Sequence, residues 1–546
     1  MLRREFFSAS TFALGLAAPS VASAGSIQAA KSILDYGARP DGRTLNTQAI
    51  QRAIDDVFQA GGGLVYAPPG TFLIGGLELK SRVTLYLEAG CVLLGSTSIG
   101  DYAYRPGASM WGDANGHHVI FAHDADDVTL CGPGTINGQG SAYWRNIHRL
   151  PPAEEDLWQD CVAFDYKPID NHRPSPMLEF AMCRNLKISG VTLTGSAGWT
   201  LRPIACETVV IDGIRIRNPD YGSNTDGIDI TCCRNVMVSN CDISTGDDAI
   251  CLKSENPYGG MLPTKNITIT NCILTTSCNG FKMGTATHGS FENIVFSNSV
   301  IYNDESSPLN ARVMGGIAVE MVDGGSVDGV VVSNIRMQNV RAPIFVRLAH
   351  RTGNAEGSFL RNVLIDGIDA TGAVITSSIM GISGLRPRDI TVSNSRIRTS
   401  ANGTAAWAKL NPPELPATYP ESRLFGHFPS YGFYIRHADR VRLRDIELIA
   451  DKPDERPAMI CEDVEDVILS GLDASAPVGG APLIDLKSTR RAFLTGMRAP
   501  ANAAVFAQIG GADSSAIALT GISTGPQQEA VRYVDGATAD STTKME

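Results

Sequence analysis

Residues 183–190 read CRNLKISG, and the same pattern returns as CETVVIDG at 206–213 and as CRNVMVSN at 233–240. Each copy has a short polar lead, then alternating β-branched residues, then a Gly or Asn that turns the chain, which is the pattern of a β-strand with one buried face. The pattern continues in five further segments: TKNITITN (264–271), FENIVFSN (291–298), VDGVVVSN (327–334), LRNVLIDG (360–367) and PRDITVSN (387–394). The chain is therefore built on an internal repeat.

A strand that returns at so short a period cannot bury its apolar face alone, so neighbouring copies must stack on one another. We expect about three short strands in each coil, and therefore an all-β fold of the parallel β-helix type. A β-propeller would need a longer period and antiparallel hairpin turns, which are scarce here. Residues 46–60 (NTQAIQRAIDDVFQA) carry apolar residues at helical spacing and predict a short helix that caps the N-terminal end of the solenoid.

Three stretches break the repeat, near residues 98–118, 140–172 and 400–430, and they are rich in Pro, Gly and aromatic residues. We interpret them as loop insertions in a single β-helix domain that spans residues 25–546. Loops on a rigid scaffold often form the walls of binding sites.

The first 24 residues, MLRREFFSASTFALGLAAPSVASA, have a basic start, a short apolar run and an Ala-Ser-Ala end. This pattern predicts an export signal, and the Arg3-Arg4 pair favours the twin-arginine type over an ordinary Sec signal. No later stretch is apolar for long enough to form a membrane helix. We therefore expect a periplasmic or secreted protein with no membrane attachment after removal of the signal.

Composition excludes several classes of function. The chain has 546 residues, 43% of them apolar, which rules out a mostly disordered protein. A net charge of −11 argues against nucleic acid as a partner. The 12 cysteines form no paired C-x-x-C motifs, and Cys183, Cys206 and Cys233 recur at one place in the repeat, which predicts stacked, buried thiols rather than disulfides or a metal site.

Two neighbouring segments concentrate aspartate: NTDGIDI at 224–230 and STGDDAI at 244–250. Asp226 and Asp247 are about one coil apart, so they can lie on adjacent strands, and Gly246 allows the bend that brings both Asp247 and Asp248 to one side. Clustered carboxyls repel, which keeps one protonated and another ionised, and a glycosidase needs that division. The alternative is a ladder of turn residues.

The motifs Asn224-Thr225-Asp226 and Gly246-Asp247-Asp248 resemble the N-T-D and G-D-D signatures of glycoside hydrolase family 28, the polygalacturonase-like pectin hydrolases. The opening segments DYGARPDGRTLNTQAIQRAI (35–54) and GGGLVYAPPGTFLIGGLELKSRVTLYLEAGCVLLGS (61–96) are also similar. The resemblance runs from about residue 33 to beyond 340. It implies a right-handed, single-stranded, pectin-lyase-like β-helix that acts on pectic oligo- or polysaccharide, as a monomer, without a metal or other cofactor.

By this resemblance Asp247 is the general acid, and Asp226 with Asp248 holds and deprotonates the attacking water. The expected reaction inverts the anomeric carbon of an α-glycosidic bond. Asn224, in the same motif, is an expected substrate-binding residue.

The sequence departs from the family pattern in two places. In Cys278-Asn279-Gly280, Asn279 stands where the family motif G-H-G has its histidine, and His288 is an alternative source of an imidazole. The family's R-I-K motif, which binds a substrate carboxylate, falls on Ala318-Val319-Glu320. A methyl and an acid disfavour galacturonate at that position, so we expect a rhamnose-containing or otherwise substituted pectin in place of plain homogalacturonan.

Other side chains are candidates for contact with substrate. Lys253 and Lys282 lie at strand positions that can face the same cleft, with surface exposure as the alternative. Arg202 and Arg347 are weaker candidates of the same kind. Trp199 and Tyr221 can stack on sugar rings or belong to the core.

Two other functions remain open from the sequence. Pectate lyases share the solenoid, and a lyase would use the acidic cluster to bind Ca²⁺. A non-catalytic carbohydrate-binding β-helix is the second alternative, although long inserted loops are less typical of it.

Overall fold

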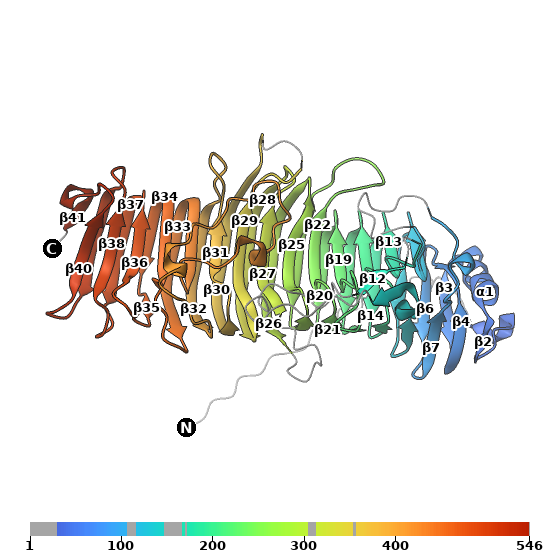
Figure 1. The fold of residues 1–546 in the computed structure, drawn as a ribbon. Helices are drawn as coiled ribbons and strands as arrows, with labels where there is room; N and C mark the ends of the chain where they lie inside the picture. The colour runs from blue at the N-terminus through green and yellow to red at the C-terminus, as the bar shows by residue number, and fades with distance from the viewer. Residues whose placement is uncertain are drawn as a thin grey trace, which may run out of the picture.

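The computed structural model describes residues 30–105, 116–146, 166–169, 172–303, 313–352 and 356–544. The expected signal at residues 1–24 lies outside the described residues, as do parts of the loops expected at 98–118 and 140–172. The described strands form one 39-stranded sheet and a separate antiparallel pair, β11 (Trp144–Asn146) and β12 (Tyr166–Pro168). Figure 1 shows the sheet winding into a long solenoid, which confirms the predicted right-handed parallel β-helix.

The solenoid has three faces, each a ladder of parallel strands. The face that carries the candidate site consists of β5 (Leu77–Glu78), β8 (Ile120–His123), β13 (Leu178–Ala181), β16 (Leu201–Ile204), β19 (Ile228–Thr231), β22 (Ile250–Ser254), β25 (Asn279–Thr287), β27 (Val313–Met321), β29 (Val340–Leu348), β31 (Ser377–Met380), the first parts of β33 (Phe433–Ala450) and β34 (Met459–Ser470), β36 (Pro482–Lys487), β38 (Val505–Gly510) and β40 (Glu529–Val534). We call it the site face.

The second face consists of β1 (Lys31–Ser32), β3 (Gly63–Ala67), β6 (Val83–Leu87), β9 (Thr129–Cys131), β14 (Arg184–Ser189), β17 (Glu207–Asp212), β20 (Arg234–Ser239), β23 (Thr264–Thr270), β26 (Ser290–Tyr302), β28 (Ser326–Gln338), β30 (Phe359–Ala373), β32 (Arg388–Thr399), the middle of β33, the later part of β34, β37 (Arg490–Arg498), β39 (Ser515–Ser523) and β41 (Thr542–Lys544). The third face consists of β2 (Asp41–Leu45), β4 (Gly70–Ile74), β7 (Cys91–Gly95), β10 (Thr135–Asn137), β15 (Thr192–Thr194), β18 (Arg215–Arg217), β21 (Asp242–Thr245), β24 (Ile273–Thr276), the ends of β26, β28, β30, β32 and β33, and β35 (Asp473–Ala474).

The repeat that opens the sequence forms the second face. Its β-branched residues, such as Val209 and Ile211 of β17, point into the solenoid and are fully buried. The polar lead stacks outside, where Asn266 donates from Nδ2 to Oδ1 of Asn235 at 2.9 Å. The cysteines stack as predicted, because the backbone N–H of Cys183 donates to Sγ of Cys206 at 3.3 Å. All the cysteines among the described residues are free thiols.

A single α-helix in the described residues, α1 (Thr47–Gln59), lies at the N-terminal end. It begins and ends within one residue of the predicted segment, and its buried residues are Ala49, Ile50, Ala53, Ile54 and Val57. These side chains belong to the same apolar core as the first strands, so the helix covers the end of the solenoid. The 3-10 helices in the part of the chain that the structure describes are η1 (Ile33–Tyr36), η2 (Ile99–Asp101), η3 (Gly140–Tyr143), η6 (Trp407–Lys409), η7 (Ser422–Phe425) and η8 (Ala539–Ser541). None of the helices described is long and apolar enough to span a bilayer.

Residues 412–428, which we call the strap, cross the outside of the site face. In Figure 1 this orange segment runs over the strands towards β27. Phe425 and Phe428 of the strap form an apolar cluster with Ala318 of β27, Phe345 of β29 and Tyr434 of β33. The strap therefore covers the outer surface of these strands.

Candidate active site

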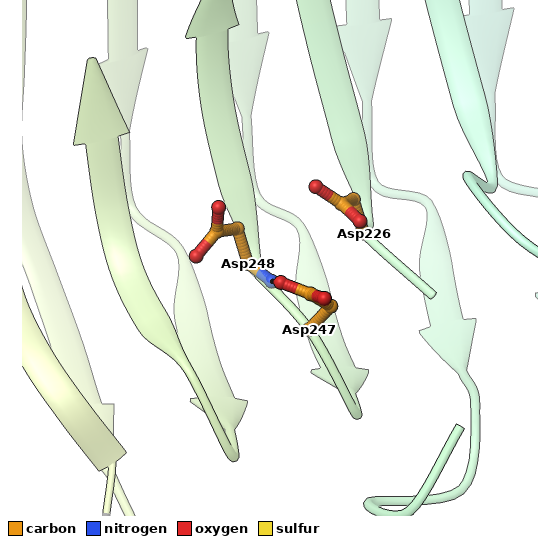
Figure 2. A group of neighbouring side chains, drawn as sticks. All are labelled: Asp226, Asp247 and Asp248. Atoms are coloured by element: carbon orange, nitrogen blue, oxygen red, sulfur yellow. Dashed lines mark hydrogen bonds between the residues drawn. The ribbon is translucent and has the colours of Figure 1, made fainter. Parts of the chain in front are cut away.

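The three aspartates lie where the chain enters two neighbouring strands of the site face (Figure 2). Ile228 of β19 is in register with Ile250 of β22, so Asp226 and Asp248, each two residues earlier, lie side by side. Gly246 makes the bend before Asp247, because a Cβ there would meet the backbone N and O of Gly222 at 2.5 Å. The backbone thus brings all three carboxyls together.

The carboxyls have different surroundings. One oxygen of each lies within 4.8 Å of the others. Burial and the charge of Asp247 raise the pKa of Asp226 well above its usual range, and Asp226 Oδ1 has no hydrogen-bond partner in the structure. Burial and the neighbouring charge of Asp248 raise the pKa of Asp247 to about 7.

Two residues of β25 contact the Asp248 carboxyl. Asn279 donates to Asp248 Oδ1 from its backbone N–H at 3.1 Å and from Nδ2 at 2.7 Å. Lys282 Nζ lies 3.1 Å from Asp248 Oδ2. Charge-assisted hydrogen bonds of this kind stabilise a carboxylate, so the site places Asp248, with an ammonium and an amide as partners, beside Asp247, whose pKa is raised.

The opposite side of the cluster is built by Lys253 of β22. Its Nζ lies 3.6 Å from Asp229 Oδ1 and 4.8 Å from the ring centroid of Trp199. Arg202 of β16, which is fully buried, lies over the same Trp199 ring at 5.2 Å and pairs with Glu179 at 3.4 Å. The Trp199 ring therefore contacts two cationic side chains, Lys253 and Arg202.

These residues open onto one pocket of about 440 Å³. It is lined by Trp199, Asn224, Asp226, Asp247, Asp248, Lys253, Cys278, Thr285, Ala286, Arg351, Tyr419, Glu421, Arg423 and Leu424. Its volume falls within the roughly 300–1,000 Å³ of small-molecule binding sites, and most of its lining residues are polar or charged.

The sequence profile of the glycosyl hydrolases family 28 matches residues 66–412, which is more than half of the chain. The chain belongs to family 28 of the glycosyl hydrolases. A second profile, described as rhamnogalacturonase A/epimerase, pectate lyase-like, matches residues 30–99 of this family 28 chain. Membership places it among the glycosidases.

Individual relatives agree. The family 28 chain is 30% identical over 326 residues to a probable polygalacturonase of Vitis vinifera. The aligned region covers 57% of this chain and 61% of that relative. It is 27% identical over 374 residues to an endo-polygalacturonase of Pectobacterium carotovorum subsp. carotovorum. This aligned region covers 65% of this chain and 85% of that relative. A hyperthermoactive exopolygalacturonase from Thermotoga maritima shares the fold, with a TM-score of 0.59 and 22% identity over 78% of this chain and 92% of that one.

Four predicted substrate-binding residues of the family 28 chain lie at the cluster. Asn224 lines the pocket, and its Oδ1 accepts from Arg173 Nη2 at 3.4 Å. Lys253 lines the pocket as well, and Asn279 and Lys282 contact Asp248 instead of the open space. Arg173 was not singled out from the sequence, where nothing distinguishes it from a surface arginine.

Glu320, Ala318 and His288 lie elsewhere. Glu320 is 1% exposed and does not line the pocket, but Oε2 is 3.9 Å from Lys282 Nζ. Burial raises the pKa of Glu320 to about 8. Ala318 is packed under the strap against Phe345. His288 follows the last residue of β25, at the other end of that strand from Asn279, and does not line the pocket.

The weaker candidates from the sequence lie in different places relative to the pocket. Arg202 packs on Trp199, and of the two only Trp199 lines the pocket. Arg347 is buried and donates to backbone oxygens of Gly381 and the strap. Tyr221 stacks edge-on against Trp144.

Four charged or aromatic residues of the pocket are not among those predicted from the sequence: Arg351, Tyr419, Glu421 and Arg423. The last three belong to the strap, within the segment that we interpreted as a loop near 400–430. Arg351 follows β29 and is held by both oxygens of Asp323 at 3.0 and 3.1 Å. The interrupted repeat was the signal for the strap, but it did not show which residues enter the site.

The aspartate cluster also has a possible metal-binding geometry. Within the residues described, it is the one group of acidic, His or Cys side chains whose ligand atoms converge closely enough for a metal ion. Oxygen ligands of this kind suit Ca²⁺. However, the Lys282 ammonium at 3.1 Å from Asp248 already supplies a positive charge there, and a second cation would be repelled.

Activity is expected to fall as the pH rises through about 7. Asp247, which the family motif predicts as the general acid, must carry its proton in that role. Burial together with the charge of Asp248 raises the pKa of Asp247 to about 7, so the proton is present below that pH and lost above it. On the alkaline side kcat/KM should drop about tenfold per pH unit. Initial rates between pH 4 and 9 check this, and a rate that stays level up to pH 9 contradicts it.

Proposed function

We propose that this protein hydrolyses α-glycosidic bonds of pectic polysaccharide by an inverting, two-carboxylate mechanism. The observation that carries the proposal is the pairing, in one pocket, of Asp247, whose pKa is raised to about 7, with Asp248, which is ion-paired to Lys282 at 3.1 Å. A protonated carboxyl beside an ionised one is what acid–base cleavage of a glycoside requires. The family 28 membership and the two signature motifs support it.

In the proposed reaction Asp247 donates its proton to the glycosidic oxygen as the bond breaks. Asp226 and Asp248, side by side on adjacent strands, hold a water between them. Asp248 takes a proton from that water as its oxygen attacks the anomeric carbon. Lys282 and Asn279 keep Asp248 ionised for this step, and Lys253 and Trp199 line the wall where a sugar ring would stack.

We expect the product to have the inverted anomeric configuration. The reason is the separation of roles, since the acid and the water-holding pair are different carboxyls. The oxygen spacing within 4.8 Å is shorter than the roughly 6.5–9.5 Å usual for inverting pairs, so spacing alone does not decide the outcome. Proton NMR of the first product formed is the measurement. A retained configuration would mean that one aspartate acts as a nucleophile.

The finer part of the proposal is a rhamnose-containing or substituted pectin as substrate. Its support is the absence of the family's cationic pair at Ala318 and Glu320. Both residues are buried, and because the pKa of Glu320 is raised to about 8, its carboxyl is neutral at mildly acidic pH. The effect on galacturonate is therefore a missing partner more than a repulsive charge.

A panel of substrates tests this choice. We expect a higher kcat/KM on rhamnogalacturonan fragments than on oligogalacturonate of the same length. Faster hydrolysis of oligogalacturonate would refute the preference and leave Lys253 or a strap residue as the carboxylate partner. Restoring the family pattern with Ala318→Arg is a poor test, because Ala318 is 1% exposed and packed in the apolar cluster under the strap.

The same panel separates the two other functions. A lyase would release an unsaturated product that absorbs in the ultraviolet, and a chelator would abolish its activity. A binding protein would retain the oligosaccharide without releasing reducing ends. Reducing ends without ultraviolet absorbance, unaffected by chelator, would support hydrolysis.

We also propose that residues 1–24 direct export by the twin-arginine route. The support is the Arg3-Arg4 pair ahead of the short apolar run. A variant with Arg3→Lys and Arg4→Lys should remain in the cytoplasm, and continued export would point to a Sec signal.

A further inference from the structure

The strap is fixed to the solenoid at its first residues by three side chains of the site face. Arg347 of β29 donates from Nη1 to the backbone O of Gly381 at 2.7 Å and from Nη2 to the backbone O of Glu414. Arg436 of β33 donates to the backbone O of Pro412 at 2.7 Å. His437 Nε2 lies 2.8 Å from Glu414 Oε1. The start of the strap is therefore tied to two strands by two arginines and a histidine.

The end of the strap is held by apolar packing. Phe425 packs on Phe345 with ring centroids 5.8 Å apart, and Phe428 packs on Tyr434 at 5.4 Å. Arg347 also lies over the Phe425 ring at 5.1 Å. With both ends fixed, the residues between them have a defined position above the aspartates.

Tyr419 is the strap residue that contacts the catalytic machinery. Lys282 Nζ donates to the Tyr419 hydroxyl oxygen at 3.0 Å, and the Tyr419 ring also lies against Arg351, 5.5 Å from its guanidinium carbon. Lys282 is 1% exposed and stands between two carboxyls, 3.1 Å from Asp248 and 3.9 Å from Glu320. The Tyr419 hydroxyl is thus a third polar contact of the Lys282 ammonium, beside the two carboxyls.

We propose that Tyr419 is a positioning residue that holds the Lys282 ammonium against Asp248 and away from Glu320. The proposal rests on the proposed function, in which ionised Asp248 activates water. Lysine has a long flexible side chain whose ammonium can serve either carboxyl, and Ala318, which is in register with Lys282 on the next strand, offers only a methyl group. The strap supplies the polar contact that β27 lacks.

Loss of this contact has a chemical consequence. If the ammonium moves towards Glu320, it leaves Asp248 with less positive charge beside it, and the carboxylate becomes easier to protonate. The groups that face Lys282 and Tyr419 and share this balance are Asp247, Asp248, Glu320, Glu421, Lys253, Arg351 and Cys251. Because Asp248 must be ionised to act in the proposed reaction, loss of the contact should move the acid limb of the pH–rate profile to higher pH than in the unmodified protein.

Tyr419→Phe tests the proposal, since it keeps the ring and removes the hydroxyl. We expect kcat to fall about tenfold, which matches the loss of one charge-assisted hydrogen bond, with KM changed less than twofold and the acid limb of the pH profile moved to higher pH. Tyr431→Phe is the matched control, because the Tyr431 hydroxyl donates to the backbone O of Ser475 at 2.7 Å and Tyr431 does not line the pocket. This control should keep its kcat and its pH profile.

A crystal structure of Tyr419→Phe gives a readout that does not depend on activity. We expect the Lys282 ammonium to lie closer to Glu320 than to Asp248. An ammonium that stays on Asp248, together with an unmoved acid limb, overturns the proposal, as does an equal loss of kcat in Tyr431→Phe. If the unmodified protein releases no product from any pectic substrate, the proposed function fails, and the position of the ammonium in the variant still decides the role of Tyr419.

Discussion

Asparagine in place of Asp247 is expected to lower kcat by about a hundredfold or more. The amide cannot give a proton to the leaving oxygen, and acid–base assistance by one side chain is worth roughly a hundred- to ten-thousandfold. Asp226→Asn should cost as much, because an amide changes the donors and acceptors that hold the attacking water. Initial rates on a pectic oligosaccharide at pH 5 measure both, since Asp247, with a pKa of about 7, carries its proton there.

Asp485→Asn is the matched control for these two variants. Asp485 lies on β36 of the same site face, is 5% exposed and also has a pKa raised by burial, but it does not line the pocket. Its kcat should stay within about twofold of the unmodified enzyme, within the range of substitutions away from functional features. Near-normal turnover in Asp247→Asn would remove Asp247 as the acid.

Much of the fold could be predicted because its causes are local and repeated. Val209 and Ile211 are buried by the same alternation that fills the next coil, so one strand read correctly predicts the others. The capping helix α1 has a continuous apolar stripe within 13 residues. The aspartate cluster could be predicted for a similar reason, since the two motifs lie one coil apart and each is continuous in sequence.

The rest of the site depends on contacts between distant residues. Tyr419 and Lys282 are 137 positions apart, and no periodic signal relates an irregular segment to a strand. The burial of Glu320 has the same origin: alternation along β27 turns this side chain outwards, and its depth is set by what packs over it. Gly246 is intermediate, because a glycine beside two aspartates indicates a bend but not the packing against Gly222, where an added Cβ would lie 2.5 Å from the backbone N and O.

The second large effect is expected on stability, at Asp454, whose partner Arg456 contacts the last residue of the strap. This carboxylate accepts from Arg456 Nε at 2.9 Å and Nη2 at 2.7 Å and from the backbone N–H of Gly403 at 3.0 Å. Arg456 is 2% exposed, donates to the backbone O of Phe428 at 3.1 Å and lies over the Trp407 ring. Burial acts to raise the pKa of Asp454, but Arg456 more than offsets it and the net direction is downward.

Asp454→Ala should lower the free energy of unfolding by about 3–5 kcal/mol, because it leaves the buried Arg456 guanidinium without its carboxylate. Asp389→Ala is the matched control: Asp389 pairs with Arg440 through two bonds of 2.6 and 2.7 Å, but both side chains are at least one-third exposed, so its loss should cost at most about 1 kcal/mol. Urea denaturation measures both.

The dependence on pH identifies the cause of the loss. A carboxyl whose folded pKa is lowered stabilises the protein above its unfolded pKa, about 3.9, and that contribution disappears as the pH falls through the lower folded value. The stability gap between Asp454→Ala and the unmodified protein should therefore be full at pH 7 and shrink below about pH 4. Adding Arg456→Met to Asp454→Ala should recover most of the loss, since no buried charge is then left unpaired. If the double variant is as unstable as Asp454→Ala alone, the loss of stability comes from the missing hydrogen bond to the Gly403 N–H and not from an unpaired Arg456 guanidinium.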